Sequence, residues 1–387
     1  MFKIRTLNAI SSVVHEILTP DRYTIADDIA SPDALLVRSA KCLDMTFSKE
    51  LRAIARAGAG VNNIPIERCT QEGIVVFNTP GANANAVKEL VFASMMMASR
   101  NLYDAIDWCK SLQGKGDEIG SLVETGKKRF IGKELKGKTL GVIGLGAIGV
   151  LVANEGFAIG MNVVGYDPFI SVEHAWKLSR SIHRVLSLDE LVAQCDYISI
   201  HVPLTKDTRN YLSADTIYNI KRGATVLNFA RGELVESEAM LNALEDGIVS
   251  KYIVDFPSEE MIDANNVICI PHLGASTPES EENCAVMAAE QLSDFLENGN
   301  IANSVNFPAC ELARMGEMRI CIVNTNKPNM IGQFTALLSE KGANITNMLN
   351  KSRGSIAYTM FDLDETINNG IIEKLMQING VIRVTTL

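Results

Sequence analysis

The stretch LGVIGLGAIG, residues 140–149, constrains the fold of this chain more than any other feature. Its glycines, Gly144, Gly146 and Gly149, have the spacing GxGxxG, with a β-rich run before them and a helical pattern after them. An acidic residue, Asp167, ends the next β-rich run 18 residues after Gly149. Such a strand, glycine turn, helix and acidic strand end are typical of a dinucleotide-binding unit. The alternative is a buried turn in which the glycines serve only packing.

Each part of this unit has its own physical role. Gly144 permits the tight turn, Gly146 lets backbone N–H groups approach a pyrophosphate, and Gly149 lets the helix pack on the strand. The Asp167 carboxylate can accept hydrogen bonds from both ribose hydroxyls and repels a 2′-phosphate, which favours NAD over NADP. Free N–H groups at the helix start face an anion. The predicted cofactor contacts in this turn are Gly144, Gly146, Ala147, Ile148 and Gly149.

Strand-like and helix-like patterns alternate along the chain. Residues 33–39 and 51–58 are predicted as strands with a helix between them, and a long helix is expected over 85–112. The polar, Gly-rich segment 113–137 is expected to be a loop or linker. Regular alternation from residue 138 predicts an α/β fold with a doubly wound parallel sheet of Rossmann type.

The tail has a different pattern. From about residue 316 the order is strand, helix, hairpin, helix and strand. This βαββαβ order is that of a small ferredoxin-like domain.

The composition excludes several classes of function. The 387 residues carry a formal net charge of −10, which disfavours binding to nucleic acids or anionic membranes. The most apolar run, residues 140–153, is shorter than the roughly 20 residues of a spanning helix. The eight cysteines form no CxxC pair or Cys/His cluster, so we expect free thiols, no metal site and a reducing, cytoplasmic location.

Polar side chains follow the predicted strands downstream. Arg231 follows one strand, Asp255 the next and His272 a third, and Glu259 and Glu260 come shortly after Asp255. Ligands of open parallel sheets bind where the carboxyl ends of the strands meet. Singly, these residues have ordinary explanations as a solvated Arg, surface carboxylates and a turn His. Together they supply an anion clamp, a carboxylate and a titratable base beside a nicotinamide site.

The whole chain resembles the D-2-hydroxyacid dehydrogenase family. The motifs that carry the resemblance are VRSA (37–40), RAGAGVNNI (56–64), NTPGANANAVKEL (78–90), GLGAIG (144–149), ARG (230–232), FPSEE (256–260) and PHLGAST (271–277). The resemblance implies a Rossmann-type NAD domain inserted in a flavodoxin-like substrate-binding domain, followed by a tail similar to ACT regulatory domains. The implied domains are substrate-binding parts at 1–92 and 283–312, the NAD domain at 93–282 and the ACT-like domain at 316–387.

The resemblance also implies an activity, the NAD-dependent oxidation of D-3-phosphoglycerate to 3-phosphohydroxypyruvate in L-serine biosynthesis. Arg231 would clamp the substrate carboxylate through two hydrogen bonds and polarise the C2 oxygen. His272 would take the hydroxyl proton as general base, and a Glu would orient His272 and raise its pKa. Counting without a gap from Arg231 selects Glu260, which we favour, whereas alignment on Phe-Pro selects Glu259.

The same resemblance assigns binding residues. Asp255 would lie near the nicotinamide end of the cofactor. Further cofactor contacts would come from Val202, Pro203, Ala230, His272 and Gly274. The substrate would be bound by Arg38, Ser39, Arg56, Asn83 and Lys127, and the cations in this set would hold its phosphate. Arg56 has the alternative of an ordinary position on a helix surface.

In the tail, Asn326 and Asn344 match positions that bind L-serine between two ACT domains. Asn329 stands where a Gly usually follows the Pro. The alternative is that the tail only mediates oligomerisation, and a homodimer or homotetramer is expected in either case.

Two other functions stay open. The chain could be another D-2-hydroxyacid dehydrogenase that acts on an unphosphorylated acid, or an NAD-sensing, corepressor-like binding protein. The presence of Arg231, Glu260 and His272 counts against the binding protein, which would bind NAD with negligible turnover.

Overall fold

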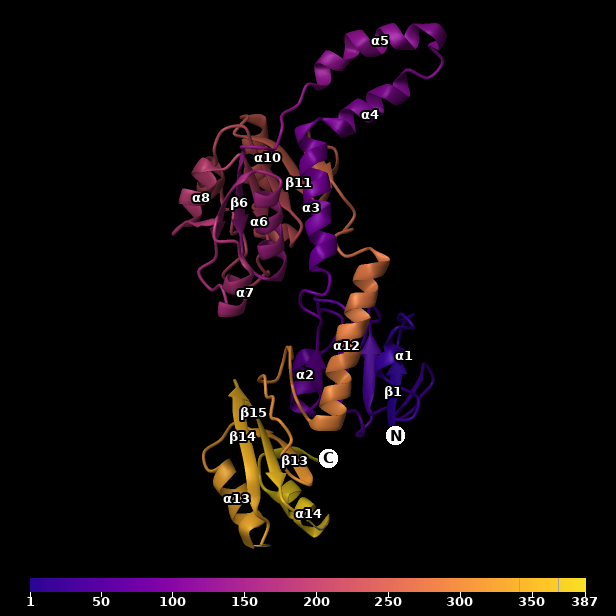
Figure 1. Ribbon diagram of the computed structural model, residues 1–387, viewed down its shortest axis with the longest axis vertical. Helices are drawn as coiled ribbons and strands as arrows, with labels where there is room; N and C mark the ends of the chain where they lie inside the picture. Colours follow the sequence, from indigo (N-terminus) through magenta and orange to yellow (C-terminus); the bar gives the residue numbers. More distant parts are fainter. Residues whose placement is uncertain (341, 368) are drawn as a thin grey trace. The chain divides into compact units, whose positions relative to one another are not determined.

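The computed structural model describes residues 1–387 apart from residues 341 and 368. The chain divides into two compact units, one formed by Met1–Ala82 with Glu281–Leu387 and the other by Asn83–Ser280 (Figure 1). The first unit is therefore discontinuous, and the second is inserted within it. The predicted domain boundaries are finer than this division and stay a prediction.

The first unit begins with a parallel sheet of five short strands. These are β1 (Phe2–Thr6), β2 (Tyr23–Ala26), β3 (Ala34–Val37), β4 (Ala53–Arg56) and β5 (Val75–Phe77), with α1 (Val14–Ile17) and α2 (Ile66–Gln71) between them. The order β2-β1-β3-β4-β5 is flavodoxin-like, as predicted. The long helix α12 (Pro278–Asn298) packs Ala285, Ala288 and Leu292 into the core of this sheet.

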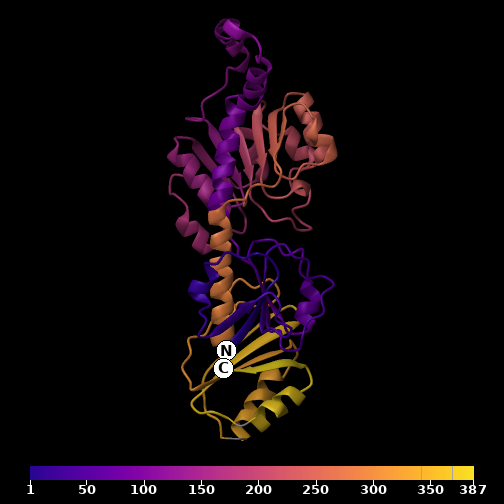
Figure 2. The ribbon, with the colours of Figure 1, turned by 90° about the vertical axis from the view of Figure 1, so that its right-hand side faces the viewer.

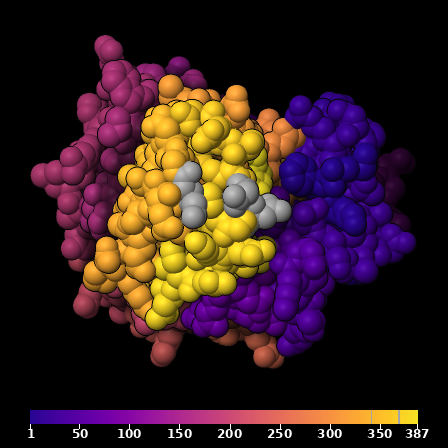
Figure 3. All heavy atoms as spheres, turned by 90° about the horizontal axis from the view of Figure 1, so that it is seen from below, coloured from indigo at the N-terminus to yellow at the C-terminus, as the bar shows by residue number. Residues whose placement is uncertain are grey.

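The end of the chain forms the expected ferredoxin-like domain within the same unit. Its elements are β13 (Met318–Thr325), α13 (Met330–Glu340), β14 (Ile345–Arg353), β15 (Ile356–Leu363), α14 (Asn369–Gln377) and β16 (Val381–Thr386). The antiparallel sheet has the order β14-β15-β13-β16. One face packs Ile320, Ile322 and Phe361 against α13 and α14. The other face continues the core of the first sheet through Val323, Tyr358 and other buried residues. Figures 2 and 3 show the C-terminal domain in yellow beside the N-terminal part of the same unit in indigo.

Hydrogen bonds reinforce this shared core. The Tyr358 hydroxyl donates to the carbonyl oxygen of Gly299 at 2.8 Å. The Arg353 guanidinium donates to the carbonyl oxygen of Ser304 at 2.9 Å. Arg319 is fully buried, and its guanidinium donates to both oxygens of Asp362 at 2.6 and 2.8 Å and to the carbonyl oxygen of Asn298 at 2.8 Å. The end of α12 is thereby fixed to the ferredoxin-like sheet.

The second unit contains a parallel sheet of seven strands. These are β6 (Thr139–Ile143), β7 (Asn162–Tyr166), β8 (His183–Arg184), β9 (Tyr197–Ile200), β10 (Ala224–Asn228), β11 (Val249–Val254) and β12 (Val267–Cys269). The order β12-β11-β10-β9-β6-β7-β8 contains the classical Rossmann order and confirms the predicted fold class. The connecting helices are α6 (Ala147–Ala158), α7 (Val172–Lys177), α8 (Leu188–Gln194), α9 (Ala214–Tyr218), η3 (Gly232–Leu234), α10 (Ser237–Glu245) and α11 (Glu259–Ile262).

The segment before this sheet differs from the sequence prediction. The long helix expected over 85–112 is two helices, α3 (Ala84–Ser99) and α4 (Leu102–Ser111), because Asn101 adopts a left-handed φ of 51° between them. The expected loop 113–137 contains η1 (Gly116–Glu118), α5 (Ile119–Gly126) and η2 (Lys127–Phe130). Residues 102–130 form an arm that projects from the sheet (Figure 1). The Trp108 ring fills the space where a side chain at Gly126 would lie.

The prediction of a helix between β3 and β4 is also wrong. Residues 40–50 form turns and irregular backbone. The Asn63 side chain donates to the carbonyl oxygen of Ala40 at 2.7 Å, and the Cys42 N–H donates to the carbonyl oxygen of Asn63 at 2.8 Å. These tertiary hydrogen bonds replace the bonds that a helix would make. In the described part of the chain, no helix combines the length and apolar character of a membrane span.

Candidate active site

The glycine turn joins β6 to α6. Gly144 has φ of 87°, and a Cβ there would lie 2.6 Å from the carbonyl oxygen of His201 and 2.8 Å from Val202 Cγ1. A Cβ at Gly149 would lie 1.9 Å from the carbonyl oxygen of Gly144. The space beside Gly146, just before the helix, is open. The turn therefore requires two glycines for its own packing and leaves the helix N-terminus accessible to an anion.

Asp167 lies at the end of β7, beside this turn. One carboxylate oxygen accepts the N–H of Leu145 at 2.8 Å, and the other accepts the N–H of Phe169 at 2.8 Å. Each carboxylate oxygen can accept a second hydrogen bond. The side chain is thus fixed in place with capacity left for two ribose hydroxyls.

Arg231 follows β10 and lies over the ring of Phe256, with the guanidinium carbon 5.1 Å from the ring centre. Its Nη1 donates to the carbonyl oxygen of Ala230 at 2.6 Å. The Asn228 amide donates to the carbonyl oxygen of Arg231 at 2.8 Å and fixes the backbone beneath it. The cation is half-buried, so its charge acts in a medium less polar than water.

His272 follows β12 and has φ of 46°, a rare backbone conformation for a residue with a side chain. Its N–H donates to the carbonyl oxygens of Asp255 and Ile270, each at 3.0 Å. Its ring lies against Phe256, with 4.2 Å between ring centres. Strained backbone of this kind clusters at functional sites, and here it is held by two strand ends.

Asp255, at the end of β11, is 1% exposed, and neither of its carboxylate oxygens has a hydrogen-bond partner within the described residues. Burial raises the pKa of Asp255 to about 6, although the charge of Arg231 opposes the rise. A Cβ at Gly274 would lie 3.4 Å from this carboxylate. An unsatisfied acceptor beside a glycine fits a ligand that carries N–H donors, such as the carboxamide of nicotinamide. The residues present therefore fit the predicted cofactor.

The other predicted cofactor residues lie at the same carboxyl edge. Val202 and Pro203 follow β9, and the hydroxyl of Thr208 donates to the carbonyl oxygen of Pro203 at 2.6 Å. Burial lowers the pKa of the neighbouring His201 to about 3, so its ring is neutral. His201 is not among the residues predicted from the sequence, and its Nε2 lies 2.8 Å from the hydroxyl of Ser199.

Glu259 and Glu260 occupy the first turn of α11, and both are exposed. Hydrogen bonding to the backbone N–H at the start of this helix lowers the pKa of Glu260, which keeps it ionised at neutral pH. The choice between the two as partner of His272 stays a prediction. No cluster of three or more metal-binding side chains occurs in the described residues.

The predicted phosphate-binding residues Arg38, Ser39 and Arg56 lie together in the first unit. Arg38 follows β3 and forms an ion pair with Glu281. Arg56 ends β4 rather than lying on a helix, and its Nε donates to the carbonyl oxygen of Arg38 at 3.0 Å. The side chain of Arg56 therefore contacts the loop that carries Arg38.

Asn8 is a positioning residue that sequence analysis missed. Its side-chain oxygen accepts the consecutive N–H groups of Arg38, Ser39 and Ala40 at 3.2, 3.0 and 2.8 Å. One oxygen thus fixes the conformation of the loop that carries Arg38. No sequence motif marks this contact, because Asn8 is 30 residues away from Arg38.

Asn83 and Lys127 belong to the second unit. Asn83 immediately precedes α3. Lys127 lies in η2 on the arm and forms an ion pair with Glu124. The arm leaves and rejoins the unit near Asn101 and Ile131, whose side chain and carbonyl oxygen are hydrogen-bonded at 3.3 Å. The structure therefore does not bring Lys127 next to Arg231 within one chain.

In the tail, Asn326 follows β13 and Asn344 precedes β14. The Asn326 N–H bonds to Ser355 at the turn of the β14–β15 hairpin, whereas the Asn344 carbonyl oxygen bonds to Asp364 at its open end. A hairpin of this length separates its ends by roughly 25 Å. One chain therefore cannot place both Asn side chains on one amino acid.

Comparison with known proteins gives a family assignment. Residues 92–274 match the model of the D-isomer specific 2-hydroxyacid dehydrogenase, NAD binding domain. The D-3-phosphoglycerate dehydrogenase of Methanocaldococcus jannaschii is 36% identical over 304 residues, which are 76% of this chain and 56% of that protein. The protein of the same name from Rattus norvegicus is 37% identical over 286 residues, covering 72% of this chain and 51% of its own length. The chain spans about half the length of the curated relatives it matches.

Solved structures match over most of both chains. The crystal structure of NAD+-bound 3-phosphoglycerate dehydrogenase from Entamoeba histolytica is 30% identical, with a TM-score of 0.62 over 79% of this chain and 98% of that one. The D-lactate dehydrogenase of Aquifex aeolicus, complexed with NAD and lactic acid, is 25% identical, with a TM-score of 0.58 over 79% and 100%. With this fold, this glycine turn and these relatives, the chain belongs to the D-isomer-specific 2-hydroxyacid dehydrogenase family.

Proposed function

We propose that this chain oxidises D-3-phosphoglycerate to 3-phosphohydroxypyruvate with NAD, the entry reaction of L-serine synthesis. The observation that carries the proposal is the convergence of Arg231, Asp255 and His272 with the glycine turn on one sheet edge. The names of the relatives from Methanocaldococcus jannaschii and Rattus norvegicus support this substrate.

Each residue of the sheet edge has a defined task in this reaction. When bound, NAD supplies the acceptor for the hydride that leaves C2 of the substrate. Arg231 binds the substrate carboxylate and holds C2 in place, because its planar guanidinium matches a carboxylate. His272 accepts the proton of the C2 hydroxyl, and Glu260 favours its protonated form. Asp255 orients the nicotinamide end by accepting its amide N–H.

The phosphate is assigned to the first unit. Arg38 and Arg56 supply two cations, Ser39 supplies a hydroxyl, and Asn8 fixes the loop that carries Arg38 and Ser39. In a protein with a net charge of −10, local cations are needed to attract a phosphorylated acid.

NADH formation tests the proposal directly. Purified full-length chain is incubated with NAD and D-3-phosphoglycerate, D-glycerate or D-lactate at alkaline pH, and NADH absorbance is followed. We expect turnover with the phosphorylated acid alone, and Arg38→Ala should raise KM for that substrate by about tenfold or more. Turnover of the unphosphorylated acids alone would overturn the substrate assignment.

Substitution of His272 tests its assignment as general base. His272→Ala should lower kcat by about 10²- to 10⁴-fold while NADH binding is kept. Full activity of this variant would overturn the assignment of His272. NAD binding by the wild type without turnover in either direction would instead favour a corepressor-like binding protein.

For the tail we propose an ACT-type regulatory function with L-serine as effector. Asn326 of one chain and Asn344 of a second copy would bind one serine, because they lie at opposite ends of the same hairpin. This arrangement requires at least a homodimer. Inhibition by L-serine that is lost in both Asn326→Ala and Asn344→Ala is expected, and unchanged inhibition in either variant would contradict the site.

We further place the protein in the cytoplasm. All eight cysteines are free, which supports a reducing compartment.

A further inference from the structure

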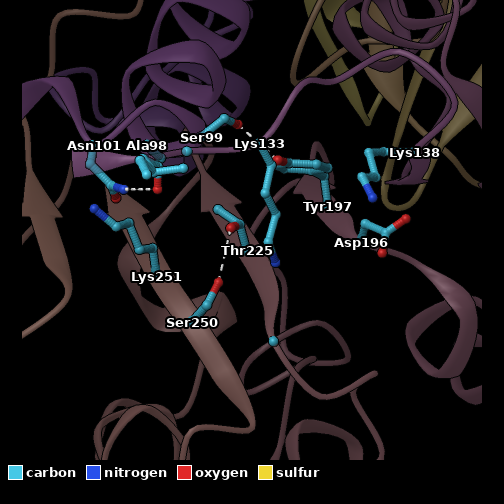
Figure 4. A pocket seen from close by; sticks show the side chains of 13 residues that line it. Ala98, Ser99, Asn101, Lys133, Lys138, Asp196, Tyr197, Thr225, Ser250 and Lys251 are labelled. Carbon is cyan, nitrogen blue, oxygen red and sulfur yellow. Dashed lines mark hydrogen bonds between the residues drawn. The ribbon is translucent and has the colours of Figure 1, made fainter. Parts of the chain in front are cut away.

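A polar cavity lies in the second unit, at the edge of the sheet opposite the glycine turn. It has a volume of about 170 Å³ and opens at the amino ends of β6, β9, β10 and β11 (Figure 4). The end of α3 and the segment 131–133 close its other side. The space is roughly ten times the 15 Å³ that one water requires, so it admits a small polyatomic ligand.

Lysines dominate the charge of this cavity. Lys133, Lys138 and Lys251 line it, and neither Lys133 nor Lys138 has an ion-pair partner among the described residues. Lys251 is only 15% exposed, and its contact with the exposed Asp104 is long, at 3.6 Å. Figure 4 shows the Lys133 side chain extending between Thr225 and Tyr197.

The one acidic side chain in the lining is already compensated. Asp196 accepts the ammonium of Lys221 at 2.8 Å and the N–H of Thr139 at 2.9 Å. Burial alone would raise the pKa of Asp196, but these hydrogen bonds hold it below its ordinary value. Two carboxylates, Asp104 and Asp196, thus stand against four lysines, Lys133, Lys138, Lys221 and Lys251. The cavity therefore carries excess positive charge, although the protein as a whole is acidic.

Hydroxyl groups complete the lining. Ser99 and Tyr197 share a hydrogen bond at 2.8 Å, and Thr225 and Ser250 share another at 3.3 Å (Figure 4). Ser99 donates its proton to the carbonyl oxygen of Met95 at 2.6 Å, and Ser250 donates to that of Ala224 at 3.0 Å. The protons of all four hydroxyls are therefore engaged within the protein, and an anion in this cavity would be bound by the lysine ammonium groups.

We propose that this cavity binds a small multivalent oxyanion of the phosphate type, held by Lys133 and Lys138. Ammonium groups on flexible stems bind phosphate oxygens as point charges. Lys133 lies in the segment that follows the arm, and Lys138 lies just before β6. An anion bound by both lysines therefore links the base of the arm and the end of α3 to the sheet. Its binding therefore stabilises the second unit.

Thermal unfolding of the full chain tests this site. Inorganic phosphate is titrated at constant ionic strength, with chloride as the replaced anion. Phosphate at ten times its Kd should raise Tm by about 2–4 °C. The double variant Lys133→Met, Lys138→Met should weaken phosphate binding at least tenfold and lose most of this rise.

Two further variants separate this site from other sources of binding. Lys49→Met removes an exposed lysine of the first unit and should keep the full rise. Arg38→Ala removes the proposed substrate-phosphate contact, so it loses only the part of the rise in Tm that comes from that contact. The part that this variant keeps and the double lysine variant loses belongs to the cavity, whether or not the proposed function holds. The same rise in the double lysine variant as in the wild type would overturn the proposal.

Two other measurements use the wild-type protein, so they do not depend on correct folding of the variants. Anomalous density from selenate beside Lys133 and Lys138 in a crystal supports the site, and a pocket without selenate at saturating concentration contradicts it. Glycerol 3-phosphate compared with inorganic phosphate distinguishes the sources: tighter binding of the ester assigns the site to a phosphorylated metabolite, and tighter binding of phosphate assigns it to the free ion.

Discussion

Two aspartates at or near the carboxyl ends of strands are almost completely buried, yet their surroundings are opposite. Asp362 is 0% exposed, and its oxygens accept two hydrogen bonds from Arg319 and one from the N–H of Met315 at 3.0 Å. Asp255 is 1% exposed, and neither oxygen has a hydrogen-bond partner in the described part of the chain.

The difference appears in the pKa values. Burial would raise the pKa of Asp362, but its bonds to Arg319 and Met315 hold it below its ordinary value. Burial raises the pKa of Asp255 to about 6, because the charge of Arg231 compensates only in part. A buried carboxylate whose hydrogen bonds are all made stabilises the fold, whereas one that lacks partners can accept hydrogen bonds from a ligand.

The largest effect is expected from Asp362→Ala. This change leaves the Arg319 charge uncompensated in the core and should lower the free energy of unfolding by about 3–5 kcal/mol at pH 7. The folded-state pKa of Asp362 is depressed, so its contribution is present above about pH 4 and is lost as pH falls below that value. Urea unfolding measures the change, with the exposed Asp364→Ala as control. A loss below 1 kcal/mol would contradict the structural role.

Asp255→Asn should act in the opposite direction. The folded-state pKa of Asp255 is raised, so the wild type loses stability as pH rises from about 4 to 6. Above pH 6 the Asn variant should be more stable by up to roughly 3 kcal/mol, and this advantage should vanish below pH 4. Unfolding curves of the wild type and the variant at pH 4 and pH 8 test this. The same difference in the free energy of unfolding at both pH values would contradict the raised pKa of Asp255.

Asp167 lies between these extremes, because each of its oxygens accepts one backbone N–H. Asp167→Ala should raise the Kd for NAD by about 10- to 100-fold and relax the discrimination against NADP. Fluorescence titration with both reduced cofactors measures the change. If the variant still prefers NADH over NADPH, another residue must bind the ribose hydroxyls.

The smallest effect is expected from Asp104→Ala. Asp104 is 59% exposed and lies 3.6 Å from Lys251, so its loss should change the free energy of unfolding by less than about 1 kcal/mol. The same change should tighten phosphate binding slightly, because it removes a competing carboxylate. Weaker phosphate binding would contradict the charge argument for that cavity.

The local features of this molecule were predictable from its sequence. The glycine turn and Asp167 form one short motif whose spacing is fixed by backbone geometry, and the structure places them as predicted. Strand and helix periodicity gave the correct fold class for the seven-stranded sheet and for the C-terminal sheet. The flavodoxin-like order of the first sheet was implied by the family resemblance.

Features that depend on distant contacts were not predictable. Arg319 and Asp362 read as ordinary surface charges, and only the register of β13 on β15 makes them opposite neighbours. The helix α5 was missed because its glycines hide the spacing of Ile119, Leu122 and Val123, which is that of one helix face. The break at Asn101 and the loop contact of Asn8 likewise leave no local signal.

The shared core of the first unit has a consequence for exchange of domains between relatives. The ferredoxin-like sheet buries Tyr358 and Val323 in the same core as Leu36 and Phe77 of the first sheet. A recombination point in the connecting segment 311–317 would divide that core and separate Arg319 from the carbonyl oxygen of Asn298. Grafting the tail of this protein onto another dehydrogenase therefore requires the transfer of both surfaces of the shared core.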